Sequence, residues 1–336
     1  MKPPSFDYLA PGTVAEAVNA LAVPGRRAEV LAGGQSLILD MRLRRTSPDV
    51  VVDINGIDEL ADVRVERGAL LAGALARHRD FESPLVAPGP LGRLLSRAVV
   101  NVAHPPIRAR GTMAGSLAWA HPASEWCAVA LALDAGIELR GPAGARVVAA
   151  RDYFRGPHAT ARAPQELITS VRLPLLPGGT GVAFAEHRRT QFCFAQVAVA
   201  VALTVRDGVI AEARIALANC ADRPLRAHAA ERSLIGAEAL PPGHGRPPPT
   251  RTEALPDLPP STRTEAVPDL RPPAYGPFAR AARIAAQDDA DPVPEPYADV
   301  EYRRHAIAVL VARALYEASA DGWAHAADDL PGGDPR

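Results

Sequence analysis

The apolar and polar positions at the start of the chain alternate between strand-like and helix-like patterns. The predicted elements are strands over 6–9, 29–32 and 49–54 and helices over 14–21 and 37–43. Thr13 directly precedes the first helical pattern, where a hydroxyl side chain can cap the free backbone N–H groups. This strand–helix–strand–helix–strand order predicts a small parallel or mixed sheet.

The middle of the chain predicts a second unit of mixed structure. A turn at Arg67-Gly68 separates two strand patterns and indicates a hairpin. A Pro- and Gly-containing stretch over 174–181 follows and is predicted to be a linker. The other elements expected here are strands over 60–65, 69–72, 137–139, 146–149 and 167–173 and helices over 77–81, 91–100 and 126–135.

The pattern changes after residue 181. Three strand patterns, with a hairpin turn at Asp207-Gly208, precede two helical patterns. Strands followed by helices indicate a separate α+β domain, here with a three-stranded antiparallel sheet. The strands are expected over 182–187, 195–206 and 209–218, and the helices over 227–234 and 302–320. We therefore divide the chain into domains 1–176 (subdomains of about 1–57 and 58–176) and 177–320, with a loose tail over 321–336.

A proline-rich stretch over 240–274 interrupts the second domain. Its residues 250–258 return, with small changes, at 262–270. Such a composition cannot pack a core, so we expect an extended or disordered insertion. A docking role is the alternative, and a tolerated insertion is the favoured interpretation.

Composition excludes several classes of function. The formal net charge of −1 over 336 residues gives no basic field for nucleic acid. The three cysteines are scattered without a Cys-x-x-Cys pair, so an iron–sulfur cluster or other metal site is not expected on this chain. No apolar run is long enough to span a membrane. These features predict a cytoplasmic protein.

Two glycine loops are the most informative stretches. The first runs from Ala32 through Gly33, Gly34, Gln35 and Ser36 to Leu37. The second includes Gly111, Thr112, Met113, Ala114, Gly115 and Ser116. Glycines let a backbone turn tightly and present N–H groups to an anion. Neither loop has the sequence of a P-loop or of a dinucleotide fingerprint. A single loop of this kind is more often an ordinary turn, but together they predict an extended ligand with a pyrophosphate, held from two sides.

The two loops and their surroundings resemble the FAD-binding (medium) subunit of molybdenum hydroxylases. This family includes carbon monoxide dehydrogenase, xanthine dehydrogenase and nicotine-type dehydrogenases. The resemblance extends from the first loop to the stretch 52–55, from 106 to 126 around the second loop, and to 222–226 and 302–305. It implies an α+β fold: a two-subdomain FAD-binding domain of the PCMH (vanillyl-alcohol-oxidase-like) type, followed by a smaller α+β domain.

The resemblance also implies which residues contact FAD. The cofactor-binding residues expected are Ala32, Gly33, Gly34, Gln35, Ser36, Leu37, Thr112, Met113, Ala114, Gly115, Ser116, Glu125, Ile168 and Glu186. No catalytic side chain is expected. The chain departs from the family pattern at Ala109, Ala114, Trp119, His121 and Cys193, which puts fine contacts with the flavin in question.

The implied function is electron transfer within a complex. A small [2Fe–2S] subunit would supply electrons and a large molybdopterin subunit would oxidise the substrate, as a dimer of heterotrimers. FAD would pass the electrons to NAD, a quinone or another acceptor. Two alternatives stay open at this point: a stand-alone flavin oxidoreductase, and a non-enzymatic scaffold that has lost FAD.

Overall fold

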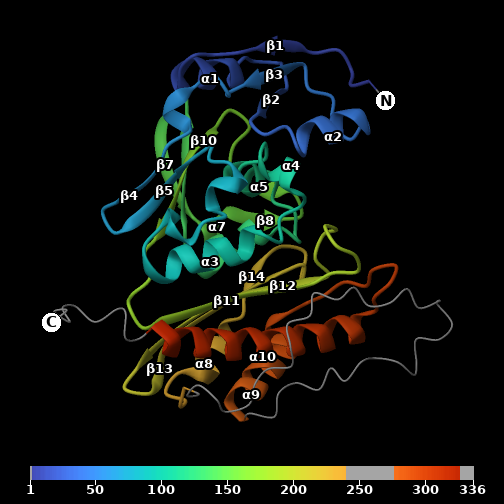
Figure 1. Ribbon diagram of the computed structural model, residues 1–336. Helices are drawn as coiled ribbons and strands as arrows, with labels where there is room; N and C mark the ends of the chain where they lie inside the picture. The colour runs from blue at the N-terminus through green and yellow to red at the C-terminus, as the bar shows by residue number, and fades with distance from the viewer. Residues whose placement is uncertain (1, 240–275, 326–336) are drawn as a thin grey trace.

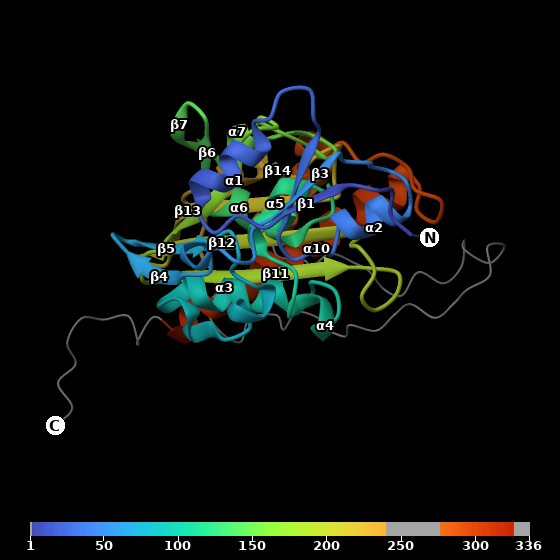
Figure 2. The ribbon, with the colours of Figure 1, turned by 90° about the horizontal axis from the view of Figure 1, so that it is seen from above.

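The computed structural model describes residues 2–239 and 276–325, in which three larger β-sheets follow one another from the N-terminal end (Figure 1). The predicted insertion over 240–274 and the last residues, 326–336, lie outside the described part. Helices lie between and beneath the sheets, as the view from above also shows (Figure 2).

The N-terminal sheet has three parallel strands, which is one of the two arrangements, parallel or mixed, that the sequence predicts. Strand β3 lies between the other two, and its three valines are almost fully buried. Thr13 caps the first helix, since its Oγ1 accepts a hydrogen bond of 3.2 Å from the Glu16 N–H. The elements are β1 (Asp7–Leu9), α1 (Val14–Leu21), β2 (Ala28–Leu31), α2 (Leu37–Arg42) and β3 (Val50–Asp53).

The middle sheet has five antiparallel strands in the order β4-β5-β10-β6-β7. Its strands are β4 (Val63–Glu66), β5 (Ala69–Gly73), β6 (Gly136–Gly141), β7 (Gly144–Ala149) and β10 (Leu167–Pro174). A two-stranded hairpin pairs β8 (Phe154–Gly156) with β9 (Ala159–Thr160). The helices are α3 (Gly89–Val99), α4 (Pro105–Arg108), α5 (Met113–Trp119), α6 (Glu125–Ala132) and α7 (Ala150–Tyr153), with short 3-10 turns at Asp58–Leu60, His78–Phe81 and Pro84–Val86.

The C-terminal sheet has four strands, so the prediction of three strands was wrong. The fourth is β14 (Leu225–Arg226), which pairs with only two residues of its neighbour and is too short to leave a periodic pattern. The sequence also gave no sign of helix α9. The elements are β11 (Thr180–His187), β12 (Val197–Arg206), β13 (Val209–Ala218), β14, α8 (His228–Leu234), α9 (Gly276–Ile284), a π-helical turn (Ala285–Asp289) and α10 (Val300–His325).

Both faces of the C-terminal sheet are covered. Along β12, Ala198 and Ala200 pack into the same core as helices α3, α5 and α6, whereas Val199 and Val201 pack against the helices α8, α9 and α10. A strand that is buried on two sides needs apolar residues at every position, and β12 is fully buried from Val197 to Thr204. The sheet therefore joins the two parts of the chain.

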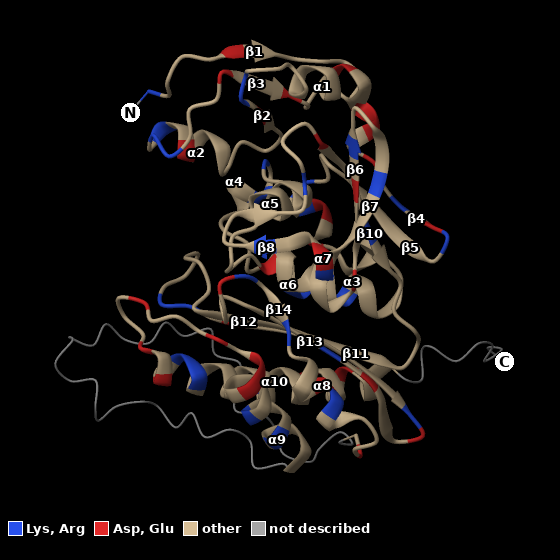
Figure 3. Ribbon diagram, turned by 180° about the vertical axis from the view of Figure 1, so that it is seen from behind, with Lys and Arg blue, Asp and Glu red and all other residues tan. Residues whose placement is uncertain are grey.

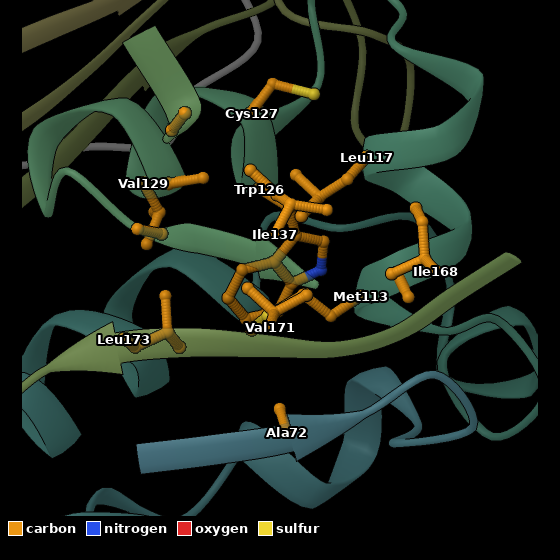
Figure 4. Packing of buried hydrophobic residues seen from close by; sticks show 14 of the residues in the cluster. Ala72, Met113, Leu117, Trp126, Cys127, Val129, Ile137, Ile168, Val171 and Leu173 are labelled. Atoms are coloured by element: carbon orange, nitrogen blue, oxygen red, sulfur yellow. The ribbon is translucent and has the colours of Figure 1, made fainter. Parts of the chain in front are cut away.

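Trp126 lies at the centre of the larger core. Figure 4 shows its indole among Met113 and Leu117 of α5, Ile137 of β6 and Val171 of β10. The indole is only 1% exposed, and its Nε1 donates a hydrogen bond of 2.9 Å to His78. One large aromatic side chain thus holds α5 and α6 against the middle sheet.

The last described helix extends beyond the predicted end of ordered structure. Helix α10 runs to His325, so residues 321–325 are helical and the predicted loose tail begins too early. The reason is Asp321, whose carboxylate is 3% exposed and pairs with Arg93 at 3.2 Å and with Arg97. It also accepts a hydrogen bond of 3.0 Å from the Val182 N–H. These contacts tie α10 to α3 and β11.

Charged residues of both signs are interspersed over the ribbon, for example on the hairpin of β4 and β5 and on α10 (Figure 3). In the described residues, no helix combines the length and the hydropathy that a membrane crossing requires.

We predict that Asp321→Ala lowers the free energy of unfolding by about 3 kcal/mol, because it leaves a half-buried arginine pair and a buried N–H without their acceptor. Asp7→Ala is the matched control, since it removes an exposed ion pair with Arg26 that contributes about 1 kcal/mol or less. Urea unfolding followed by circular dichroism measures both values. Equal losses for the two variants would contradict this role of Asp321.

Candidate functional site

A cavity of about 520 Å³ opens between the N-terminal and middle sheets. Both glycine loops contribute to its wall. Of the residues predicted to contact FAD, the following line it: Ala32, Gly33, Gly34, Gln35, Ser36, Leu37, Thr112, Ala114, Gly115, Ser116 and Ile168. The two loops, far apart in sequence, are therefore brought to one site.

The loops meet where two glycines face each other. A Cβ atom on Gly33 would lie 2.4 Å from the Arg110 carbonyl oxygen and 2.6 Å from the Gly111 Cα. A Cβ on Gly111 would lie 2.6 Å from Nε2 of His78. Only glycine allows this approach, so the spacing of the two loops is set by the absence of side chains.

The second loop leads into helix α5. Thr112 is its N-cap, and its Oγ1 accepts a hydrogen bond of 3.0 Å from the Gly115 N–H. Ala114, which replaces a glycine of the family pattern, is 3% exposed, and its methyl group is accommodated in the core. The substitution thus leaves the loop's shape intact.

Several hydrogen-bond donors in the cavity wall are free. In the described part of the chain, neither the Ser36 hydroxyl nor the Ser116 hydroxyl has a hydrogen-bond partner, although both residues line the cavity. Gln35 is used differently, because its Nε2 donates to the Gly33 carbonyl at 3.0 Å and stabilises the first loop. Free hydroxyls beside glycine backbones suit the oxygens of a phosphate or ribose, so the residues present fit FAD.

Three of the predicted residues do not line the cavity. The Met113 side chain points into the core beside Trp126 (Figure 4). Glu125, at the start of α6, is 7% exposed, and Glu186 lies at the end of β11 with its side chain 1% exposed. The two carboxyl groups interact with each other at the junction of the two parts of the chain.

This carboxyl pair is protonated more readily than free carboxylates are. Burial raises the pKa of Glu125 to about 7, and burial together with the nearby Glu125 charge raises the pKa of Glu186 to about 9. Both Glu186 oxygens lack a hydrogen-bond partner, and Arg188 approaches Oε1 at 3.5 Å. Burial thus favours the protonated form of both carboxyl groups.

His78 is a part of the cavity wall that the sequence did not identify. Its Nδ1 accepts the Trp126 hydrogen bond, and burial lowers its pKa to about 4, so the ring is neutral at pH 7. The ring also packs directly against Gly111. His78 thus positions the second loop, and its partners Gly111 and Trp126 reveal this role.

Two of the residues that depart from the family pattern belong to an aromatic cluster beside the cavity. Trp119 and His158 line the cavity, and their rings lie 4.9 Å apart. The His121 ring stacks on Trp119 at 4.9 Å and on Phe194 at 4.2 Å, and the Trp119 and Phe194 rings also lie 5.9 Å apart. Phe194 is 53% exposed. Trp119 also donates to Asp40 at 3.1 Å.

The fold and the cavity define a flavin-binding class of protein, and comparison with known proteins specifies it. The family described as the FAD binding domain in molybdopterin dehydrogenase matches residues 4–176, and the CO dehydrogenase flavoprotein C-terminal domain matches 182–241. The chain belongs to this family of FAD-binding subunits of molybdopterin dehydrogenases. It is an oxidoreductase subunit, and its cofactor is FAD.

Individual relatives agree. The chain is 39% identical to the carbon monoxide dehydrogenase medium chain of Afipia carboxidovorans over 70% of its own length and 82% of the relative's. It is 33% identical to the 6-hydroxypseudooxynicotine dehydrogenase complex subunit alpha of Paenarthrobacter nicotinovorans, over 95% of its own length and 96% of the relative's. A structure of reconstituted CO dehydrogenase from Oligotropha carboxidovorans superposes with a TM-score of 0.81 at 32% identity, covering 96% of this chain and 100% of that one.

We predict that Gly33→Ala abolishes stoichiometric FAD binding, because the added methyl group separates the two loops. Gly56→Ala is the matched control, since its Cβ would come no closer than 3.9 Å to the Pro11 carbonyl. The flavin-to-protein ratio after purification, from absorption and released flavin, measures the effect. Full flavin content in Gly33→Ala would show that the close approach is not required.

We predict that His78 makes the fold sensitive to acid. Its pKa is lower in the folded state than its ordinary value of 6.5, so the unfolded chain binds more protons and stability falls as the pH drops from about 6.5 towards about 4. Wild type should lose about 2 kcal/mol more than His78→Asn between pH 7 and pH 5. Urea unfolding at both pH values tests this, and equal losses would contradict it.

Proposed function

We propose that this chain is the electron-transfer subunit of a molybdenum-dependent dehydrogenase complex. It would take electrons from [2Fe–2S] clusters on a small partner subunit and pass them to an external acceptor. The observation that carries the proposal is the cavity formed by the two glycine loops, in a chain of this family. FAD, when bound, accepts electrons one at a time and releases them in pairs.

The residues of the chain would bind and orient the cofactor. Backbone N–H groups at Gly33 and Gly34 and at the start of α5 would donate to the diphosphate, together with the hydroxyls of Ser36 and Ser116. Ile168 would provide an apolar surface within the same wall. We propose that Met113, Glu125 and Glu186 act from behind the cavity wall. They would support the wall by packing or set the electric charge near the cavity.

No side chain in the cavity is proposed as an acid–base catalyst. A stand-alone flavin oxidoreductase would need a substrate site of its own, and the large molybdopterin subunit of the proposed complex makes one unnecessary. The scaffold alternative requires that FAD binding has been lost. The intact approach of Gly33 to Gly111 and the free hydroxyls argue against that loss.

We propose a dimer of heterotrimers as the assembly, with NAD or a quinone as acceptor. The related proteins include a medium chain of carbon monoxide dehydrogenase and a medium subunit of nicotine 6-hydroxylase, and both names indicate one subunit of a multi-subunit enzyme. All three cysteines are free, which supports a reducing, cytoplasmic compartment. We also propose that the first domain ends at residue 176 and that the second begins at residue 177.

Reduction of the purified complex tests the electron-transfer role. The complex co-purified with its partners is mixed anaerobically with the substrate of the molybdenum subunit, and the flavin and iron–sulfur absorption bands are followed separately. We expect the iron–sulfur bands to bleach before the flavin band and the flavin to be reoxidised by the acceptor. Flavin that stays oxidised while the clusters are reduced and turnover continues would overturn the proposal.

A further inference from the structure

The cavity wall has a shortage of positive charge. The acidic residues lining it are Glu29, Asp40 and Glu166, and the arginines lining it are Arg45 and Arg162. Arg45 is already paired with Asp40 at 3.5 Å and its side chain is 66% exposed. Arg162 is therefore the guanidinium in this wall that is available to an anionic ligand.

Arg162 is held firmly by the backbone and not by a carboxylate. Its Nη1 donates to the Glu166 carbonyl oxygen at 2.8 Å and, more weakly, to those of Ala163 and Pro164 at 3.3 and 3.4 Å. Over the described residues it forms no ion pair within 4.0 Å. Its Nε is buried and has no hydrogen-bond partner. Nη2, by contrast, is not buried and has no hydrogen-bond partner among the described residues, so it is the donor that a ligand in the cavity can reach.

The nearest carboxylates do not supply it. Glu166 is occupied by Arg146, which binds it through two hydrogen bonds of 2.6 and 2.8 Å, and it also accepts from the Ala163 N–H at 2.7 Å. Glu29 faces the same cavity; burial raises its pKa, and the charge of Arg162 opposes that rise. Neither carboxylate forms an ion pair with Arg162 within 4.0 Å, so its guanidinium keeps room for an anionic ligand.

The diphosphate of FAD needs such a charge. The two glycine loops offer neutral donors only, and the chain has no lysine besides Lys2. We propose that Arg162, which lines the same cavity as the glycine loops, is the cationic contact for the FAD diphosphate. The proposal rests on the FAD site proposed above and adds the source of its positive charge. A guanidinium forms strong, oriented hydrogen bonds with phosphate oxygens.

Titration of flavin-free protein tests the proposal. FAD is added to wild type, Arg162→Leu, Arg162→Lys and Arg45→Leu, and binding is followed by quenching of flavin fluorescence. We expect Arg162→Leu to weaken FAD binding roughly 10- to 100-fold. Arg162→Lys should recover part of this loss. Arg45→Leu, a change in the same wall, should alter affinity by about threefold or less.

Competing ligands identify the part of FAD that Arg162 contacts. ADP and adenosine are used to displace FAD from the wild type and from Arg162→Leu. A parallel loss for FAD and ADP, with adenosine unchanged, supports a diphosphate contact. A loss for FAD alone, or an equal loss for adenosine, overturns it.

The controls distinguish a failure of the proposed Arg162 contact from a failure of the proposed FAD site. A wild-type chain that does not bind FAD refutes the proposed site. A wild type that binds FAD beside an equally tight Arg162→Leu refutes only the role of Arg162. Thermal unfolding of each flavin-free variant checks that Leu and Lys are both tolerated in the fold, and Arg162→Lys keeps the test valid if Arg162→Leu does not fold.

Discussion

The contact between the Gly33 and Gly111 backbones determines the geometry of the site. The two loops can lie this close only because Gly33 has no side chain at the point of contact, and the second loop can lie against His78 only because Gly111 has none. His78 and Trp126 fix the second loop from behind, and the valines of β3 anchor the sheet that presents the first. The packing behind each loop thus holds the two loops in contact, and the cavity forms beside that contact.

The C-terminal sheet gives the site its support. Its strands are buried on both faces, so the N-terminal part of the chain and the helices α8, α9 and α10 share one continuous scaffold. Polar contacts at this junction are few but buried: Asp321 joins α10 to α3, and Glu125, Glu186 and Arg188 meet between α6 and β11. Charges that are buried in this way stabilise one arrangement and penalise others.

The sequence predicted local structure well and long-range pairing poorly. The bounds of α1 and its Thr13 cap, the parallel N-terminal sheet and the two loops follow from short-range patterns, and the structure confirms the elements. The order β4-β5-β10-β6-β7 joins strands that are far apart, and β14 is too short for periodicity. Asp321, His78 and Arg162 were missed because their roles depend on partners distant in sequence, which no local pattern reveals.

The central claim is that the two glycine loops form one FAD site. The most direct measurement is the absorption spectrum of the purified chain, with the released cofactor identified by chromatography. The account predicts a flavin spectrum with about one FAD per chain, and release of FAD but not FMN. A colourless chain that takes up no added FAD would contradict the account and favour a scaffold role.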